Sequence, residues 1–71
     1  PNATSETLTM YGRALFLSGS TTNAERVLRR ATEQFPVEPT AFTYLASAAR
    51  RLGHAAMAQE AEARHAALVA E

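Results

Sequence analysis

The 71-residue sequence contains no cysteine, lysine, aspartate or tryptophan, and only three glycines and three prolines. Without cysteine, neither a disulfide nor a cysteine-bound metal can stabilise the chain. A Ser-His-Asp triad and a cysteine nucleophile are excluded for the same kind of reason. No apolar run approaches the roughly 18 residues of a membrane span, and no signal peptide is visible. The compartment stays open, with the cytoplasm favoured.

The charged residues are seven arginines and seven glutamates, so the formal net charge at pH 7 is zero. A neutral chain gives no electrostatic reason to expect a nucleic acid or an anionic membrane as partner. Sixteen alanines, with so little glycine and proline, favour helix. At this length we expect one small domain, which buries about 60% of its unfolded surface.

Helix start and stop signals divide the chain into four helical segments, at about residues 5–19, 22–35, 39–53 and 55–69. Ser5 is the expected N-cap of the first segment. The sequence TNAE fits a capping box at the start of the second, in which the Thr22 hydroxyl and the Glu25 carboxylate bind free backbone amides. Short connections make consecutive helices antiparallel, so the segments form two helical hairpins.

Glycine and proline mark the ends of these segments. Gly19 and Gly53 can adopt the left-handed conformation that commonly follows a helix. Pro36 cannot continue the second helix, and Pro39 suits the first position of the third. The two glycines also close similar 12-residue sequences, LTMYGRALFLSG and FTYLASAARRLG, which lie 34 residues apart.

A shift of 34 residues matches the two hairpins in side-chain size and helix face. It pairs one apolar face of the first helix with one of the third: Leu8, Tyr11, Gly12 and Leu15 with Phe42, Leu45, Ala46 and Ala49. Residues at this spacing share one side of a helix, and we expect both sets to face the core. Gly12 and Ala46 should let a neighbouring helix approach closely. We therefore expect Gly12→Ala to be tolerated and Gly12→Leu to overpack the contact.

This pattern resembles the tetratricopeptide repeat, a 34-residue helix–turn–helix with the motif W-x2-L-G-x2-Y, then A-x3-F, then P. The first repeat follows the motif at Leu8, Tyr11, Gly12, Leu15, Ala24, Leu28 and Pro36. The second follows it at Phe42, Leu45, Ala46, Ala49 and Ala58, and departs from it at Glu62 and Ala70. The resemblance implies an all-α fold of two tandem hairpins, four antiparallel helices, stacked as a right-handed α-solenoid fragment. The resemblance also implies that the chain forms a single domain, with one repeat at about residues 5–38 and the other at about 39–71.

In the family that this chain resembles, first helices line a concave groove that holds a peptide or a protein segment. The resemblance therefore implies a partner groove at Glu6, Thr9, Arg13, Phe16, Thr40, Thr43, Ser47 and Arg50. Arg13 and Arg50 could bind a carboxylate or a carbonyl, and Phe16 an apolar side chain. A solvated helix face is the competing interpretation. Members that clamp a C-terminal carboxylate use lysine and asparagine here, and this groove has neither.

The two ends of the repeat pair differ. One flank of the first helix carries Met10, Ala14 and Leu17, which suits a preceding repeat. At the other end, Glu62 and His65 stand where a following repeat would require apolar residues. Because terminal repeats carry a polar outer face, we expect the C-terminal end of a longer array.

The sequence gives little support for a catalytic or metal-binding function. His54 and His65 lie eleven residues apart without metal-ligand spacing, and we expect His65 to pair with Glu62 instead. We expect Glu60 and Arg64 to form an ordinary surface pair. No catalytic site, cofactor or metal is therefore predicted, and the expected partner is a protein or a peptide rather than nucleic acid or membrane.

Other interpretations stay open at this point. The flank Met10, Ala14 and Leu17 could join two copies, which would make the chain a structural element for homodimer formation. The chain could also be a non-catalytic appendage of an enzyme. Pentatricopeptide repeats have similar hairpins and bind RNA, but the zero net charge and the 34-residue shift argue against them.

Overall fold

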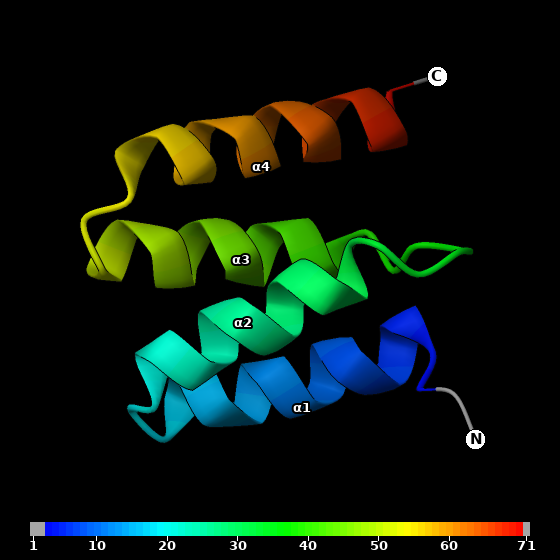
Figure 1. Cartoon of the computed structure of the whole chain (residues 1–71). Coiled ribbons are helices and arrows are strands. Elements are labelled where there is room, and N and C mark those ends of the chain that lie inside the picture. Colours follow the sequence, from blue (N-terminus) through cyan, green and yellow to red (C-terminus); the bar gives the residue numbers. More distant parts are fainter. Residues whose placement is uncertain (1–2, 71) are drawn as a thin grey trace.

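The computed structural model describes residues 3–70, which contain four α-helices and no β-strand. The helices are α1 (Ser5–Leu17), α2 (Thr21–Ala31), α3 (Thr40–Arg51) and α4 (Ala55–Val69). The pair α1 and α2 forms one antiparallel hairpin, and α3 and α4 form another (Figure 1). The expected all-α fold of two hairpins is confirmed.

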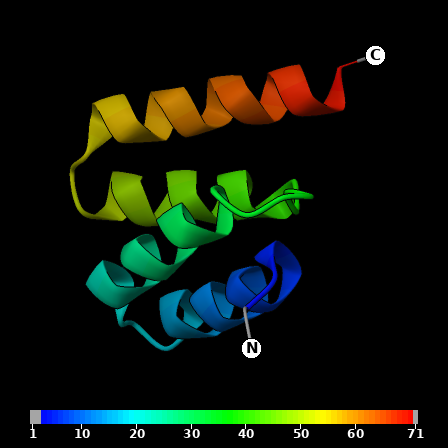
Figure 2. The same cartoon turned by 45° about the vertical axis from the view of Figure 1, so that its right-hand side comes forward.

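The two hairpins stack through α3. This helix contacts α1, α2 and α4, whereas α4 packs on α3 alone among the helices of residues 3–70. The helices α2 and α4 therefore lie on either side of α3, and they run in the same direction in both views (Figures 1 and 2). The molecule is a flat slab with Cα extents of 32 × 31 × 15 Å. No helix of the described chain is long and apolar enough to cross a membrane.

The starts of α1 and α2 differ from the prediction. The N-cap of α1 is Thr4, whose hydroxyl oxygen accepts a hydrogen bond from the Thr7 N–H at 3.1 Å. α2 begins at Thr21, and its N-cap Ser20 makes no side-chain hydrogen bond. The expected capping box is wrong because the Glu25 carboxylate lies 2.7 Å from His54 Nδ1, on the other hairpin. Glu25 thus joins the hairpins instead of capping its own helix.

The end of α2 also differs, since the helix stops at Ala31 and not near Phe35. The Thr32 hydroxyl donates to the Arg29 carbonyl at 2.7 Å, within the last helical turn. Phe35 precedes a proline, and a residue in that position is disfavoured in helical conformation. The chain from 32 to 39 therefore connects the hairpins, and Pro39 is the N-cap of α3 rather than its first residue.

The ends of α1 and α3 and both bounds of α4 agree with the prediction. Gly19 follows α1 with φ of +94°, and Gly53 follows α3 with φ of +80°. Side chains pay a steric penalty in this left-handed region and glycine does not, so the two glycines reverse the chain tightly. α4 begins at Ala55 and ends at Val69 as expected.

The core is built mainly from alanine, which lets the helices approach closely. Its main cluster consists of Ala24, Leu28, Phe42, Leu45, Ala46, Ala48, Ala49, Ala58 and Ala61. Leu28 is fully buried between the hairpins and is the largest side chain in that state. Every predicted core residue of α3 is buried, as are Leu8 and Gly12 of α1.

Leu15, the fourth predicted residue of that face, is partly buried against the main cluster, whereas 57% of Tyr11 is exposed. Its counterpart Leu45, 34 residues later, is 5% exposed and lies between α2 and α4. In hairpin two, α2 of the preceding hairpin covers this position. No hairpin precedes α1 in the described chain, so Tyr11 stays in solvent and the prediction for it is wrong.

Candidate partner-binding surface

The first helices of the hairpins, α1 and α3, contact each other through two aromatic side chains. Arg13 Nε donates to the Tyr44 hydroxyl at 3.0 Å. The Arg51 guanidinium lies 4.4 Å from the centre of the Phe16 ring, which is cation–π distance. Phe16 also packs on the main core cluster. Arg13 and Phe16, which were both predicted to line the groove, therefore help to hold the two hairpins together.

A hollow of about 350 Å³ lies between α3 and α4, and we call it the inner hollow. It is lined by Phe42, Thr43, Ala46, Ser47, Arg50, Glu62 and His65. Three of these were predicted for the groove, namely Thr43, Ser47 and Arg50, and all three are exposed. The structure brings them together with two residues of α4 that the groove prediction did not include.

Arg50 and Glu62 form the ion pair of this hollow. Arg50 Nε donates to Glu62 Oε2 at 3.1 Å, and Nη2 donates to Oε1. These hydrogen bonds and the opposite charge lower the pKa of Glu62 and raise the pKa of Arg50, so both groups stay charged at neutral pH. The expected pairing of His65 with Glu62 is wrong, because Arg50 occupies the carboxylate.

The hollow exists because hairpin two lacks a large side chain where hairpin one has Leu28. In hairpin one, Leu28 fills the space over Gly12, and a Cβ on Gly12 would lie 2.5 Å from Leu28 Cγ. The residue 34 positions after Leu28 is Glu62, which turns toward Arg50 instead of filling the space over Ala46. Substitution of one apolar residue by a charged one thus opens a polar hollow at the same place in the repeat.

The other predicted groove residues lie elsewhere. Thr9 is only 4% exposed, and its hydroxyl donates to the Ser5 carbonyl at 2.7 Å, so it cannot contact a partner and that prediction is wrong. Thr40 is exposed and bonds through its hydroxyl to the Glu38 carboxylate at 3.1 Å. Glu6 is exposed on α1.

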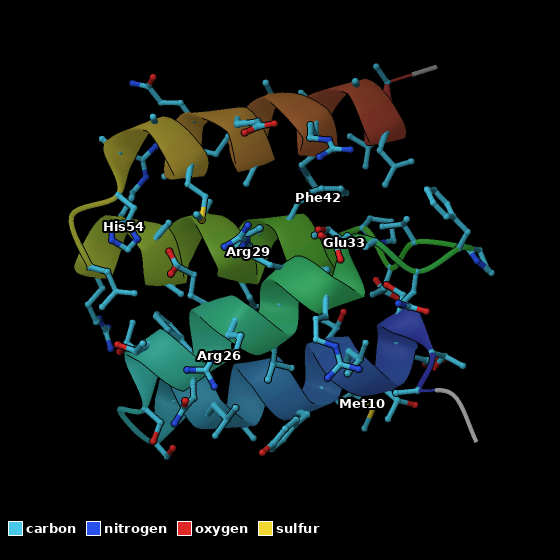
Figure 3. The ribbon with its side chains drawn as sticks, viewed as in Figure 1. Met10, Arg26, Arg29, Glu33, Phe42 and His54 are labelled. Carbon is cyan, nitrogen blue, oxygen red and sulfur yellow. The ribbon has the colours of Figure 1, made fainter. Side chains whose placement is uncertain are left out.

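The predicted self-association flank is open to solvent. Met10 is 65% exposed (Figure 3). Leu17 is 64% exposed, and Ala14 is exposed as well. Of the equivalent residues of α3, Ala48 has no exposed surface and Tyr44 is partly buried against the core, whereas Arg51, the counterpart of Leu17, is exposed. The comparison of the two helices therefore singles out α1 as the helix with an uncovered flank.

Metal ligands are not assembled anywhere in residues 3–70, where no group of three or more His or Glu side chains could hold an ion. Arg64, expected to pair with Glu60, instead lies 5.6 Å from the centre of the Phe42 ring. The residues that sequence reasoning missed at the inner hollow are Glu62 and His65. Their signal was present in the repeat, because both replace apolar residues at equivalent positions.

Two stacked hairpins of four helices, with glycine at each tight turn and small residues at the helix contacts, define a helical-repeat protein. The sequence pattern of the tetratricopeptide repeat matches residues 5–48, which is more than half of the chain. The chain therefore belongs to the tetratricopeptide repeat family. No curated protein and no solved structure shows significant similarity to it. Repeats of this family generally serve as protein-interaction modules.

Proposed function

We propose that this chain is a non-catalytic module that binds a peptide or protein segment along α1 and α3, with the inner hollow as its main contact. The observation that carries the proposal is the gathering of Thr43, Ser47 and Arg50 in one hollow of about 350 Å³. That volume is at the lower end of the about 300–1,000 Å³ found for ligand sites, and it suits one anchoring side chain of a longer segment.

The chemistry of the hollow suits a peptide. Phe42 offers an apolar surface for the anchoring side chain, and the hydroxyls of Thr43 and Ser47 can bond to main-chain groups. Arg50 uses two nitrogens on Glu62, and its remaining N–H groups can donate to a carbonyl or a carboxylate. Arg13 extends the same helix face on α1, beside Tyr44.

Loss of both arginines is expected to weaken peptide binding without unfolding the domain. Peptides selected from a random display library against the parent protein provide the probe, and isothermal titration measures their affinity. For Arg13→Ala with Arg50→Ala we expect a dissociation constant about tenfold higher or more, as for loss of a central charged contact.

The matched control removes two exposed arginines from α2, Arg26 and Arg30. These lie outside both α1 and α3, and Arg26 is on the α2 side of the molecule (Figure 3). We expect less than about threefold change, as is usual for residues outside an interface. Equal affinities for the two double variants would move the site away from this surface.

We further propose that the chain forms the C-terminal end of a longer array. Hairpin one covers the α3 flank that contains Ala48, and a preceding hairpin would cover the exposed flank of α1 in the same way. At the other end, Glu62 and His65 replace Leu28 and Ala31, which have no exposed surface. Further 34-residue repeats encoded before Pro1, with none encoded after Glu71, are the expected finding.

The exposure of Met10 and Leu17 favours a second candidate, a structural element that joins two copies through the α1 flank. For this candidate, light scattering after gel filtration is expected to give a dimer mass for the parent protein and a monomer mass for Leu17→Glu. A charged residue at the centre of an apolar interface is costly to bury, which is the reason for the expected loss. A mass unaffected by Leu17→Glu would exclude this flank.

A further inference from the structure

A second and larger hollow lies between α2 and α4, over α3, and we call it the outer hollow. Its volume is about 540 Å³, and a smaller hollow of about 300 Å³ adjoins it at the C-terminal ends of the two helices. The two hollows share Thr32, Phe35, Phe42 and Arg64. Figure 3 shows Arg29, Glu33 and Phe42 on this side of the molecule. The proposed peptide surface uses none of the charged residues found here.

Apolar side chains line the outer hollow without filling it. Phe42 and Leu45 of α3 lie under it, and Met57 of α4 forms part of its wall. Phe35, which lines both hollows, is 85% exposed, and Leu68, which lines the adjoining hollow, is 44% exposed. An aromatic ring so exposed beside an open apolar hollow is typical of a contact surface.

The rim of the outer hollow carries two arginines and two glutamates in an ordered arrangement. On the α2 side, Arg29 is followed by Glu33; on the α4 side, Glu60 is followed by Arg64. Because α2 and α4 run in the same direction, the N-terminal side holds Arg29 and Glu60, and the C-terminal side holds Glu33 and Arg64 (Figure 1). Of the four rim charges, the adjoining hollow at the C-terminal ends of the helices contains Arg64 alone.

Opposite charges thus alternate around the hollow. Among residues 3–70 the side-chain ion pairs within 4.0 Å are Arg50 with Glu62 and His54 with Glu25, so none of the four rim charges is held in such a pair within the chain. A partner segment of one charge sign would meet two like charges on this rim. The rim therefore selects a partner surface that alternates in the same way.

We propose that the partner is a second copy of this chain, docked outer hollow to outer hollow about a two-fold axis. An axis parallel to α2 and α4 places Arg29 against Glu60 of the other copy, and Glu33 against its Arg64. An axis across these helices places Arg29 against the Glu33 of the other copy, and Glu60 against its Arg64. Either orientation pairs every rim charge with an opposite one, and each copy brings an exposed Phe35 to the other.

Size and overall charge agree with this docking. The broad faces of the slab, 32 × 31 Å in Cα extent, can supply the about 800 Å² per partner of a standard interface. The net charge of zero adds no repulsion between copies. A closed two-fold contact also covers both hollows at once, and it leaves no open end from which a filament could grow.

The test measures the dimer dissociation constant by sedimentation equilibrium over a range of protein concentrations. We expect a monomer–dimer equilibrium for the parent protein. Phe35→Ser and Arg64→Glu should each raise the dissociation constant about tenfold or more, as for central interface residues. Arg64 also contacts Phe42 within its own chain, so circular dichroism melts of each variant check that the monomer remains folded.

Double variants that exchange an arginine and a glutamate of the rim distinguish lost charge pairing from a folding defect. Glu33→Arg with Arg64→Glu restores opposite charges only for the axis parallel to the helices. Glu60→Arg with Arg64→Glu restores them only for the axis across the helices. One of these double variants, and only one, should therefore recover the parent dissociation constant and identify the axis.

Leu17→Glu serves as the control on the α1 flank, and it should leave this dimer unchanged. A parent protein that stays monomeric at its highest soluble concentration would overturn the proposal. A dimer that Leu17→Glu abolishes would also overturn it and would support the α1 flank instead. Failure of both charge-exchange variants to recover the parent dissociation constant would overturn it as well. Peptide affinity at the inner hollow is measured separately, so neither result depends on the other.

Discussion

Gly12→Leu is expected to destabilise the domain by about 1–3 kcal/mol or more, because the site is already filled. A single Cβ at this position would lie 2.5 Å from Leu28 Cγ and 2.6 Å from Leu28 Cδ2. Leu28 is fully buried and cannot move aside without disturbing the core. Urea denaturation followed by circular dichroism measures the loss. A parent-like free energy of unfolding for Gly12→Leu would contradict the observed packing.

The same distances overturn the expectation that Gly12→Ala is tolerated. That expectation rested on Ala46, which occupies the equivalent position in hairpin two. Ala46 fits there because the side chain opposite it is Glu62, which turns toward Arg50. Gly12 and Leu28 form a matched pair in hairpin one. Ala46 and Glu62 occupy the same two positions of the repeat in hairpin two. We now expect Gly12→Ala to lower stability.

A double-mutant cycle with Leu28→Ala tests this pairing. Leu28→Ala alone should cost about 2–5 kcal/mol, as for other fully buried leucines. In that background, Gly12→Ala adds a methyl group to vacated space and removes a helical glycine, which is worth about 1 kcal/mol. The same substitution should therefore destabilise the parent protein and stabilise the Leu28→Ala variant. An equal effect in both backgrounds would mean that Gly12 and Leu28 are not coupled.

The number of helices and their pairing could be predicted because they depend on local signals. Gly19 and Gly53 end α1 and α3 where expected, and the spacing of Phe42, Leu45 and Ala46 identified the buried face of α3. These features need only the helical period and the conformational preferences of single residues. They are the same in both hairpins, and the 34-residue shift made them visible.

Three of the errors arise where burial or bonding of a side chain depends on residues outside its own helix. Glu25 suits a capping box locally, but its carboxylate reaches His54 of the next hairpin. Tyr11 lies on the apolar face of α1, but burial of that position requires a preceding hairpin. At the candidate site, Arg50 and Glu62 are twelve residues apart, and only the hairpin geometry brings them together. Such contacts carry no local signal in one sequence.

Ser5→Ala is expected to be among the most damaging substitutions of a polar residue, although the sequence predicts only a helix N-cap at this position. Ser5 is 2% exposed, and its hydroxyl donates to the Ala31 carbonyl at 2.7 Å. The same oxygen accepts a hydrogen bond from the Glu38 N–H at 2.8 Å. One side chain thus joins the start of α1, the end of α2 and the connection that leads to α3.

Alanine at this position leaves both backbone groups without their partner. Each unsatisfied buried group costs about 1–3 kcal/mol, against a total stability of roughly 4–11 kcal/mol for a domain of this length. We therefore expect Ser5→Ala to remove a large part of the free energy of unfolding in urea denaturation. The connection before α3 should also lose protection in amide hydrogen exchange, because the Glu38 N–H would lose its acceptor.

Two cap variants separate this role from ordinary helix capping. Ser20→Ala changes an exposed N-cap that makes no side-chain hydrogen bond, so its effect should stay within about 0.5 kcal/mol. Thr4→Ala removes the actual cap of α1 and should cost about 0.5–2 kcal/mol. If Ser5→Ala cost no more than Thr4→Ala, the hydroxyl of Ser5 would not be holding the two hairpins and their connection together. A larger cost, with the exchange of the Glu38 amide accelerated only in Ser5→Ala, is the result that this arrangement requires.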